Sequence, residues 1–419
     1  MRPILRVNDR HLKGYCPALS REIERYLKSE RTEGRVDSSG SFTLATSKAL
    51  EKLSKHSLPR ESAWVLKIVQ AAVVGGAERL TFKIRGNFVQ IELEDLVEAF
   101  NLDLFSRVLT NPVLEASPFM KNLAEALRVV GISQKRAVLL QLFGGARNPW
   151  LKILNEGEIL VSDSFDQGNL SAKQELYLSV GAPKQGWGAR LARLFGGGGW
   201  FVEEERELRR RAYLCPIRFA VDSCEISNFS QTEVGVTTSG VEPFLWGSGP
   251  SSRLLPAFQL ESRWKDWAQA ATTKRDLTPA RKMRLYWRHH QQPVGALWCL
   301  CFDFNNGRKM PSRVYWLKDG VIVDSHPIQE MEGLNLGLII YLSSHGLPTD
   351  LSGWTLRTGE SAVAKRYRAG LSAVLESVSL ASECVGYWDF SRFSQEACRI
   401  ELVALSQRFS LKTGFLPSP

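Results

Sequence analysis

The most constraining feature of this sequence is a helix-forming segment that runs directly into two short alternating segments. Residues 61–74 place apolar side chains on one stripe at helical spacing: Trp64, Ile68, Val69 and Ala72. A glycine pair ends this segment, and residues 80–84 and 89–93 then alternate apolar and polar side chains around a Gly-Asn turn. The pattern predicts a core-facing helix followed by an antiparallel hairpin whose apolar side chains share one face.

The rest of the chain mixes helices with strands. We expect residues 95–142 to be mostly helical, a second hairpin around residues 151–161, and strands near 176–180 and 215–221. In the second half we expect strands near residues 284–287, 297–304, 314–317, 321–324 and 336–342, and closing helices over about 360–382 and 392–409. The turn Lys318-Asp319-Gly320 is typical of a tight hairpin. The order of elements predicts an α+β protein.

A stretch rich in Gly, Ser, Thr and Pro marks the expected domain boundary. We expect an irregular lead and charged helix over residues 1–33, an α/β sandwich over 34–231, a linker over 232–252, and a mixed sheet-plus-helix domain over 253–419.

Length and composition fit one or two globular domains, since the chain has 419 residues and 44% of them are apolar. No apolar stretch approaches the roughly 20 residues that cross a bilayer, so we expect no membrane association. Scattered cysteines and a charged N-terminus favour a cytoplasmic location. The 54 Lys and Arg against 44 Asp and Glu give a net charge of +10, which is compatible with a polyanionic partner.

The segment from Trp64 to Ala77, read together with residues 79–84, resembles the nucleotide-binding helix and following strand of the Bergerat-fold ATPases. This is the GHKL superfamily of gyrase, the large heat-shock chaperones, histidine kinases and mismatch-repair ATPases. The resemblance covers residues 40–100 specifically and extends weakly to about residue 225. It implies a Bergerat-type sandwich in the first half of the chain, and a second domain in the place of the chaperone middle domain. An ordinary helix-plus-hairpin unit is the alternative interpretation.

The residues with which the family binds and hydrolyses ATP are replaced in this chain. The family helix reads Glu-x-x-x-Asn, where the Glu polarises water and the Asn holds magnesium; the matching positions are Lys67 and Ala71. The family's Asp-x-Gly-x-Gly matches Asp95, but Val97 and Ala99 replace its glycines. The resemblance thus implies a vestigial nucleotide site consisting of Lys67, Gln70, Ala71 and Asp95. We expect no catalytic residues, no hydrolysis and no cofactor, and Mg-ATP binding is the disfavoured alternative.

A basic segment flanks a run of four glycines at residues 196–199. Its arginines form a candidate polyanion site: Arg190, Arg193, Arg206, Arg209, Arg210 and Arg211. The interleaved acidic residues Glu203, Glu204, Glu205 and Glu207 favour instead a solvated helix with internal ion pairs.

Cysteines and histidines in the second half raise the question of a metal site. Cys299 and Cys301 share a strand face, and His289 and His290 precede them. A buried strand whose cysteines act as small apolar residues is the favoured interpretation, so we expect no metal.

These observations favour a non-hydrolysing scaffold or regulatory subunit of heat-shock-chaperone-like architecture, which acts through a protein partner. Two alternatives remain open: a nucleic-acid-binding protein that uses the basic segment over residues 190–211, and an active ATPase with rearranged ligands. Whether the chain is an enzyme stays uncertain, although the motif losses argue against it.

Overall fold

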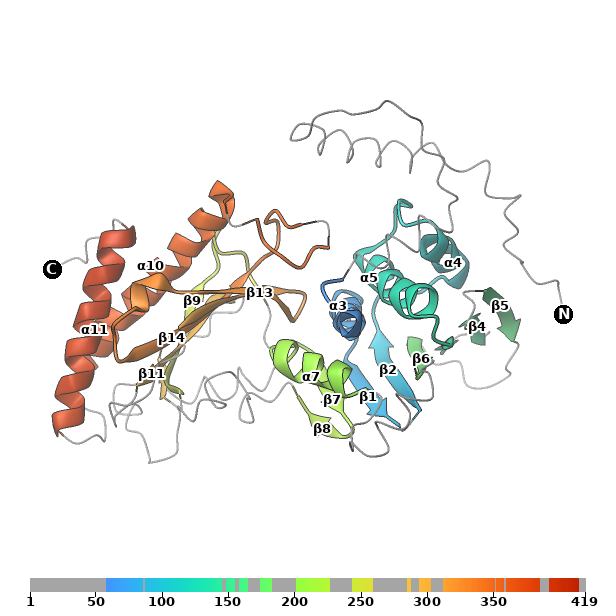
Figure 1. Ribbon diagram of the computed structural model, residues 1–419, viewed down its shortest axis with the longest axis horizontal. Coiled ribbons are helices and arrows are strands. Elements are labelled where there is room, and N and C mark those ends of the chain that lie inside the picture. The colour runs from blue at the N-terminus through green and yellow to red at the C-terminus, as the bar shows by residue number, and fades with distance from the viewer. Residues whose placement is uncertain are drawn as a thin grey trace, which may run out of the picture. The chain divides into compact units, whose positions relative to one another are not determined.

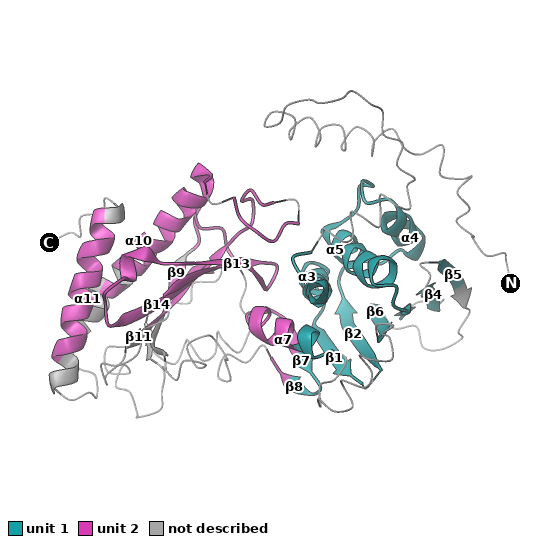
Figure 2. Ribbon diagram, viewed as in Figure 1, with its two compact units in different colours: residues 1–205, 220–224 teal, residues 206–219, 225–419 magenta. Residues whose placement is uncertain are grey.

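The computed structural model describes residues 58–85, 87–144, 148–154, 158–164, 174–182, 201–226, 243–258, 285–287, 294–302, 312–350, 352–357, 359–384 and 392–413. Two units emerge from the pattern of contacts, residues 1–205 with 220–224 and residues 206–219 with 225–419 (Figure 2). The division falls inside helix α7 (Val202–Arg211) and strand β7 (Arg218–Val221).

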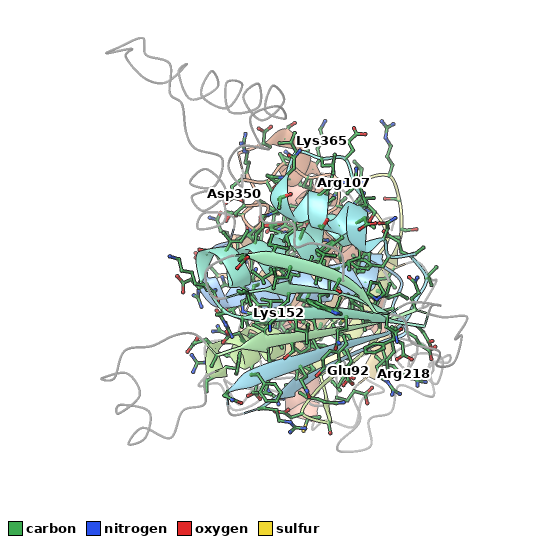
Figure 3. All side chains as sticks on the ribbon, turned by 90° about the vertical axis from the view of Figure 1, so that its right-hand side faces the viewer. Glu92, Arg107, Lys152, Arg218, Asp350 and Lys365 are labelled. Carbon is green, nitrogen blue, oxygen red and sulfur yellow. The ribbon has the colours of Figure 1, made fainter. Side chains whose placement is uncertain are left out.

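The first sheet has eight strands in the order β5-β4-β3-β6-β2-β1-β7-β8 (Figure 1). Besides β7, its strands are β1 (Arg79–Ile84), β2 (Phe88–Leu96), β3 (Val138–Phe143), β4 (Asn148–Ile153), β5 (Ile159–Ser164), β6 (Gln174–Gly181) and β8 (Cys224–Glu225). The accompanying helices are α3 (Trp64–Val74), α4 (Leu102–Thr110) and α5 (Pro118–Leu127), with short helical turns at η2 (Glu61–Ala63) and η3 (Arg128–Ser133). In these strands every second side chain points into the core, and the side chains between them lie on the opposite face of the sheet. Glu92 and Lys152, labelled in Figure 3, are on this opposite face.

Helix α3 is buried along nearly its whole circumference, which goes beyond the single stripe expected from the sequence. Every residue from Trp64 to Ala72 is buried, and α5 packs against this helix. A helix covered on all sides lies between layers rather than on a surface. Gly76 ends it with a φ of +69°, a conformation that glycine adopts without strain.

Local capping fixes where the other two helices of this unit begin. Asn101 Oδ1 accepts a hydrogen bond from the Leu104 backbone N–H at 2.9 Å, so α4 starts at Leu102. Ser117 Oγ accepts from the Met120 N–H at 3.2 Å, and Pro118 occupies the first turn of α5. In both cases the capping residue is a polar residue that directly precedes an amphipathic segment of the sequence.

The second sheet has six strands in the order β10-β9-β11-β14-β12-β13. They are β9 (Pro243–Pro250), β10 (Leu285–Trp287), β11 (Val294–Phe302), β12 (Arg313–Lys318), β13 (Val321–Pro327) and β14 (Leu336–Ser343), with a helical turn at η5 (Gln329–Met331). Helix α10 (Ser361–Cys384) packs on one face of this sheet, and α11 (Arg392–Thr413) packs on α10. The backbone of β9 packs directly against the Trp298 ring at Gly247. A Cβ atom at this position would lie 1.9 Å from the ring, so only glycine fits.

The chain is an α+β protein, as expected, and both hairpins predicted in its first half are present. The β12–β13 hairpin is also present, and Asp319 and Gly320 at its turn have φ angles of +49° and +76°. The expected helical stretch over residues 95–142 is wrong at its end, where β3 is a central strand. The apolar run that forms β3 is too short for its period to distinguish a strand from a helix.

Several expectations about domain organisation fall on residues that the structure does not describe. The expected N-terminal lead and helix over residues 1–33 are among them. The expected linker over residues 232–252 is described from residue 243 onward, where β9 begins. Within the described residues, no helix combines the length and the apolar character needed to cross a membrane.

Candidate functional site

The helix α3 carries three of the four residues of the vestigial nucleotide site. Lys67 Nζ lies 3.1 Å from Glu125 Oε2 on α5, and the two side chains are 8% and 22% exposed. A charge this deeply buried is tolerated when a partner of opposite sign accompanies it. Gln70 and Ala71 are also buried. The position that matches the family's catalytic glutamate is thus part of an interhelical ion pair.

The fourth residue, Asp95, lies at an irregularity near the end of β2. The pairing of β2 with β6 shifts register between Leu93 and Leu96, and Asp95 has a φ of +57°. Only a few non-glycine residues adopt this left-handed conformation, and Asp is among the more tolerant. The bulge ends the regular pairing and turns the chain toward the end of α3.

The loop after Asp95 is bound to the C-terminal end of α3. The backbone N–H groups of Val97 and Glu98 both donate to the Gly75 carbonyl oxygen, at 3.2 and 3.1 Å. A Cβ on Gly76 would lie 3.0 Å from Val97 Cβ, so the two chains are in close contact here. The structure therefore brings the loop that follows Asp95 to the end of α3, while Lys67 is engaged with α5.

The residues present do not fit a magnesium-bound nucleotide. Lys67 and Ala71 offer no oxygen ligand, whereas magnesium requires oxygen donors. The side chains of Val97 and Ala99 occupy exposed positions where the family has glycines. Among the described residues, no three His, Cys, Asp or Glu side chains gather in a way that could hold a metal ion.

A buried cluster around Arg136, just before β3, was not anticipated from the sequence. Arg136 is 2% exposed; its Nε donates to the Gly181 carbonyl oxygen at 2.8 Å, and its Nη1 donates to Glu204 Oε1 at 3.0 Å. Its guanidinium carbon lies 5.5 Å from the Trp64 ring centroid and 4.9 Å from that of Phe201. Burial lowers the pKa of Arg136, and the charge of Glu204 opposes this.

The expectation of a solvated helix with internal ion pairs is correct for the pair Glu207–Arg211 but wrong in its solvation, because two of the glutamates are buried. Glu204 is 8% exposed, and its Oε1 also accepts a hydrogen bond from Trp64 Nε1 at 3.4 Å. Glu207 is 4% exposed. The sequence offered no signal for this burial, because Glu204 stands in a run of three glutamates whose roles composition cannot separate.

The structure describes four of the six arginines of the candidate polyanion site; Arg190 and Arg193 lie outside the described residues. Arg206 and Arg210 are exposed, and Arg209 is half-buried. Arg211 has an internal role instead: its Nε and Nη2 donate to the carbonyl oxygens of Ile322 and Val323 at 2.6 and 2.7 Å.

A β-bulge makes this double contact of Arg211 geometrically possible. The register of β12 against β13 shifts between Trp316 and Leu317, which leaves Val323 as the extra residue. In a regular strand, successive carbonyl groups point in opposite directions. A bulge disturbs this alternation, so that the carbonyls of two successive residues reach the same guanidinium group. The Arg211 guanidinium also lies 4.8 Å from the Trp354 ring centroid.

The candidate zinc residues are only partly described. Cys299 is buried in β11, and Cys301 lies on the same strand. His289 and His290 lie outside the described residues, so their position relative to the cysteines stays a prediction.

Comparison with known proteins finds similarity to solved structures but none to curated sequences or family models. Among solved structures, the chain is similar to the B subunit of DNA gyrase from Myxococcus xanthus, with a TM-score of 0.42 and 11% sequence identity. The match covers 84% of this chain and 99% of that one. A score this low does not establish a common fold, so membership of the Bergerat-fold superfamily stays a prediction from the sequence.

Proposed function

We propose that this protein is a non-hydrolysing scaffold or regulatory subunit that acts by binding another protein. One observation carries the proposal: the position that would bear a catalytic glutamate in a Bergerat-fold ATPase holds Lys67, which pairs with Glu125 inside a helix-helix contact. A cation held in this way cannot act as a general base toward water. The proposal rests on the resemblance seen in the sequence together with this contact.

The burial around Lys67 supports the same reading. Ala71 is completely buried one turn along α3, and the loop after β2 is hydrogen-bonded to the end of that helix. Restoring a magnesium-binding amide at Ala71 would therefore require the helix packing to open. A unit with packing contacts in place of ligand-binding side chains is better suited to bind another protein than to hydrolyse a nucleotide.

Calorimetric titration of the full chain with ATP, with and without magnesium, tests the proposal. We expect no saturable heat and no phosphate release above the background of buffer alone. A matched titration after the charge exchange Lys67→Glu/Glu125→Lys, which places a carboxylate on α3 and keeps an ion pair, should give the same result. Saturable binding in the micromolar range would support an active ATPase with rearranged ligands and overturn the proposal.

Purification of the tagged chain from its native host addresses the protein partner. The proposal expects one protein to remain bound in a fixed ratio through size-exclusion chromatography and after nuclease treatment. A complex that dissolves when nuclease is added would support the nucleic-acid alternative instead.

A further inference from the structure

Three polar side chains lie together on one face of the second sheet, at the paired strands β12 and β13. Tyr315 pairs directly with Ser325, and Arg313 lies two residues before Tyr315 on the same face of the sheet. Arg313 Nη2 lies 3.2 Å from Ser325 Oγ. The Tyr315 ring stacks on Tyr341 of β14, with centroids 5.4 Å apart and planes 18° from parallel. This stacking holds the tyrosine ring, which is half-buried.

The segment after α7 lies against the same face and brings a second arginine to it. Tyr213 Oη lies 3.0 Å from Tyr341 Oη, and the two rings meet edge to face at 6.3 Å. Arg210 precedes Tyr213 by three residues, is exposed, and acts electrostatically on Tyr315. Burial raises the pKa of Tyr315, and the positive charges of Arg313 and Arg210 oppose that rise. Arg313 thus lies in this cluster directly, through its contact with Ser325, and the positive charge of Arg210 acts on the same phenol from a different element.

Within the described part of the chain, neither arginine forms an ion pair with a carboxylate. Arg313 contacts Ser325 through neutral oxygen atoms, and the buried Glu207 of α7 is engaged with Arg211, 3.6 Å away. Two positive charges that act on the same phenol favour an anion nearby. Guanidinium groups are suited to this because they bind carboxylate and phosphate oxygens through two parallel hydrogen bonds.

We propose that Arg210, Arg313, Tyr315 and Ser325 form an anion-binding cluster that takes an acidic side chain of a protein partner, either a carboxylate or a phosphorylated hydroxyl. The inference rests on the proposed protein-binding function and gives the chemistry of the partner. Nucleic acid fits less well, because a phosphate backbone needs several cations in a row and the exposed side of α7 also carries Glu203. A carboxylate and a phosphate both accept hydrogen bonds from guanidinium groups, and the experiment below distinguishes between them.

The test measures fluorescence anisotropy of labelled ten-residue peptides titrated with the full chain. One peptide is rich in glutamate, a second has a single phosphoserine among neutral residues, and a third replaces every acidic residue with glutamine. We expect saturable binding of the first or second peptide and none of the third. Arg210→Gln and Arg313→Gln should each weaken that binding about tenfold, since a charge-assisted pair contributes on this scale.

Matched controls separate a lost site from a lost fold. Arg218→Gln removes an exposed arginine of the first sheet, labelled in Figure 3, and should leave the affinity unchanged. Melting temperatures of all three variants should agree with that of the original chain. Absence of binding to both acidic peptides, or equal affinity in all variants, would overturn the proposal. So would a single-stranded oligonucleotide that binds more tightly than either peptide and loses affinity in the same two variants.

This outcome is separable from that of the proposed function. If ATP binds saturably while the acidic peptides also bind through Arg210 and Arg313, the scaffold proposal fails and the cluster stands. If neither ATP nor the peptides bind, the cluster is wrong and a scaffold with another surface remains.

Discussion

The two units differ in how they accommodate positive charge. In the first unit, the buried cations Lys67 and Arg136 each pair with a carboxylate. In the second unit, Arg211, Arg366 and Arg408 each donate to two backbone carbonyl oxygens. Carboxylates neutralise a charge, whereas carbonyls satisfy its hydrogen bonds and leave the charge in place. The first unit therefore pairs its buried cations with carboxylates, whereas the second uses these arginines as clamps on backbone carbonyls, although Arg211 also lies 3.6 Å from Glu207.

Removing the buried cation with the most contacts should have the largest effect. In Arg136→Leu, Glu204 would remain buried beside Trp64 without its cation, and we expect the unfolding free energy of the first unit to fall by about 4 kcal/mol. Chemical denaturation followed by tryptophan fluorescence measures this. The double variant Arg136→Leu/Glu204→Leu should recover much of the loss; if it is no better than the single variant, pairing is not what stabilises the cluster.

Reversing the charge of Lys67 should rank second. Lys67→Glu would put two carboxylates next to each other in a helix interface, and a loss of about 3 kcal/mol is expected, because Glu125 is less buried than Glu204. Hydrogen exchange should show the opening in α3 and α5. The exchanged pair Lys67→Glu/Glu125→Lys should recover stability, whereas persistent destabilisation would mean that helix packing rather than charge decides this contact.

The arginine clamp of the second unit should matter less, because Arg211 is 20% exposed and lies 3.6 Å from Glu207, whereas Arg136 is 2% exposed and lies 3.0 Å from Glu204. Arg211→Met removes donors from the Ile322 and Val323 carbonyls, and we expect a loss of about 2 kcal/mol in the second unit. Arg211→Lys supplies one charged donor and should recover part of it. A loss as large as that of Arg136→Leu would contradict the distinction drawn between the two units.

The smallest effect concerns pH and the ring of His326 on β13. Its Nε2 accepts a hydrogen bond from Trp316 Nε1 at 3.0 Å, which requires the neutral ring. Burial lowers the pKa of His326 below its ordinary 6.5, opposed by the charge of Asp324. The unfolded chain therefore binds this proton more readily, so the stability of the second unit should be complete above pH 6.5 and decline on acidification. His326→Gln should flatten the decline between about pH 7 and 5; an unchanged slope would assign it to other groups.

The parts that the sequence predicted share a local origin. The helix ending at Gly75-Gly76, the β1–β2 hairpin and the Asp319-Gly320 turn each follow from the spacing of a few neighbouring residues. The candidate site was harder to predict. The sequence predicts that Lys67 does not support hydrolysis, and this stays a prediction; its partner Glu125 lies 58 positions further on, and no spacing rule connects the two.

By itself, the sequence determined the α+β class, the main helix and the hairpins, because these depend on residue type and on short-range periodicity. Only the tertiary structure decided which charges are buried and what they bind. The sequence does not distinguish Arg136 from Arg211, yet Arg136 is buried with Glu204 and Arg211 binds two carbonyl groups of a bulged strand. The physical reason is that burial and ion pairing are set by elements that meet across the fold, and the cost of a charge depends on those partners.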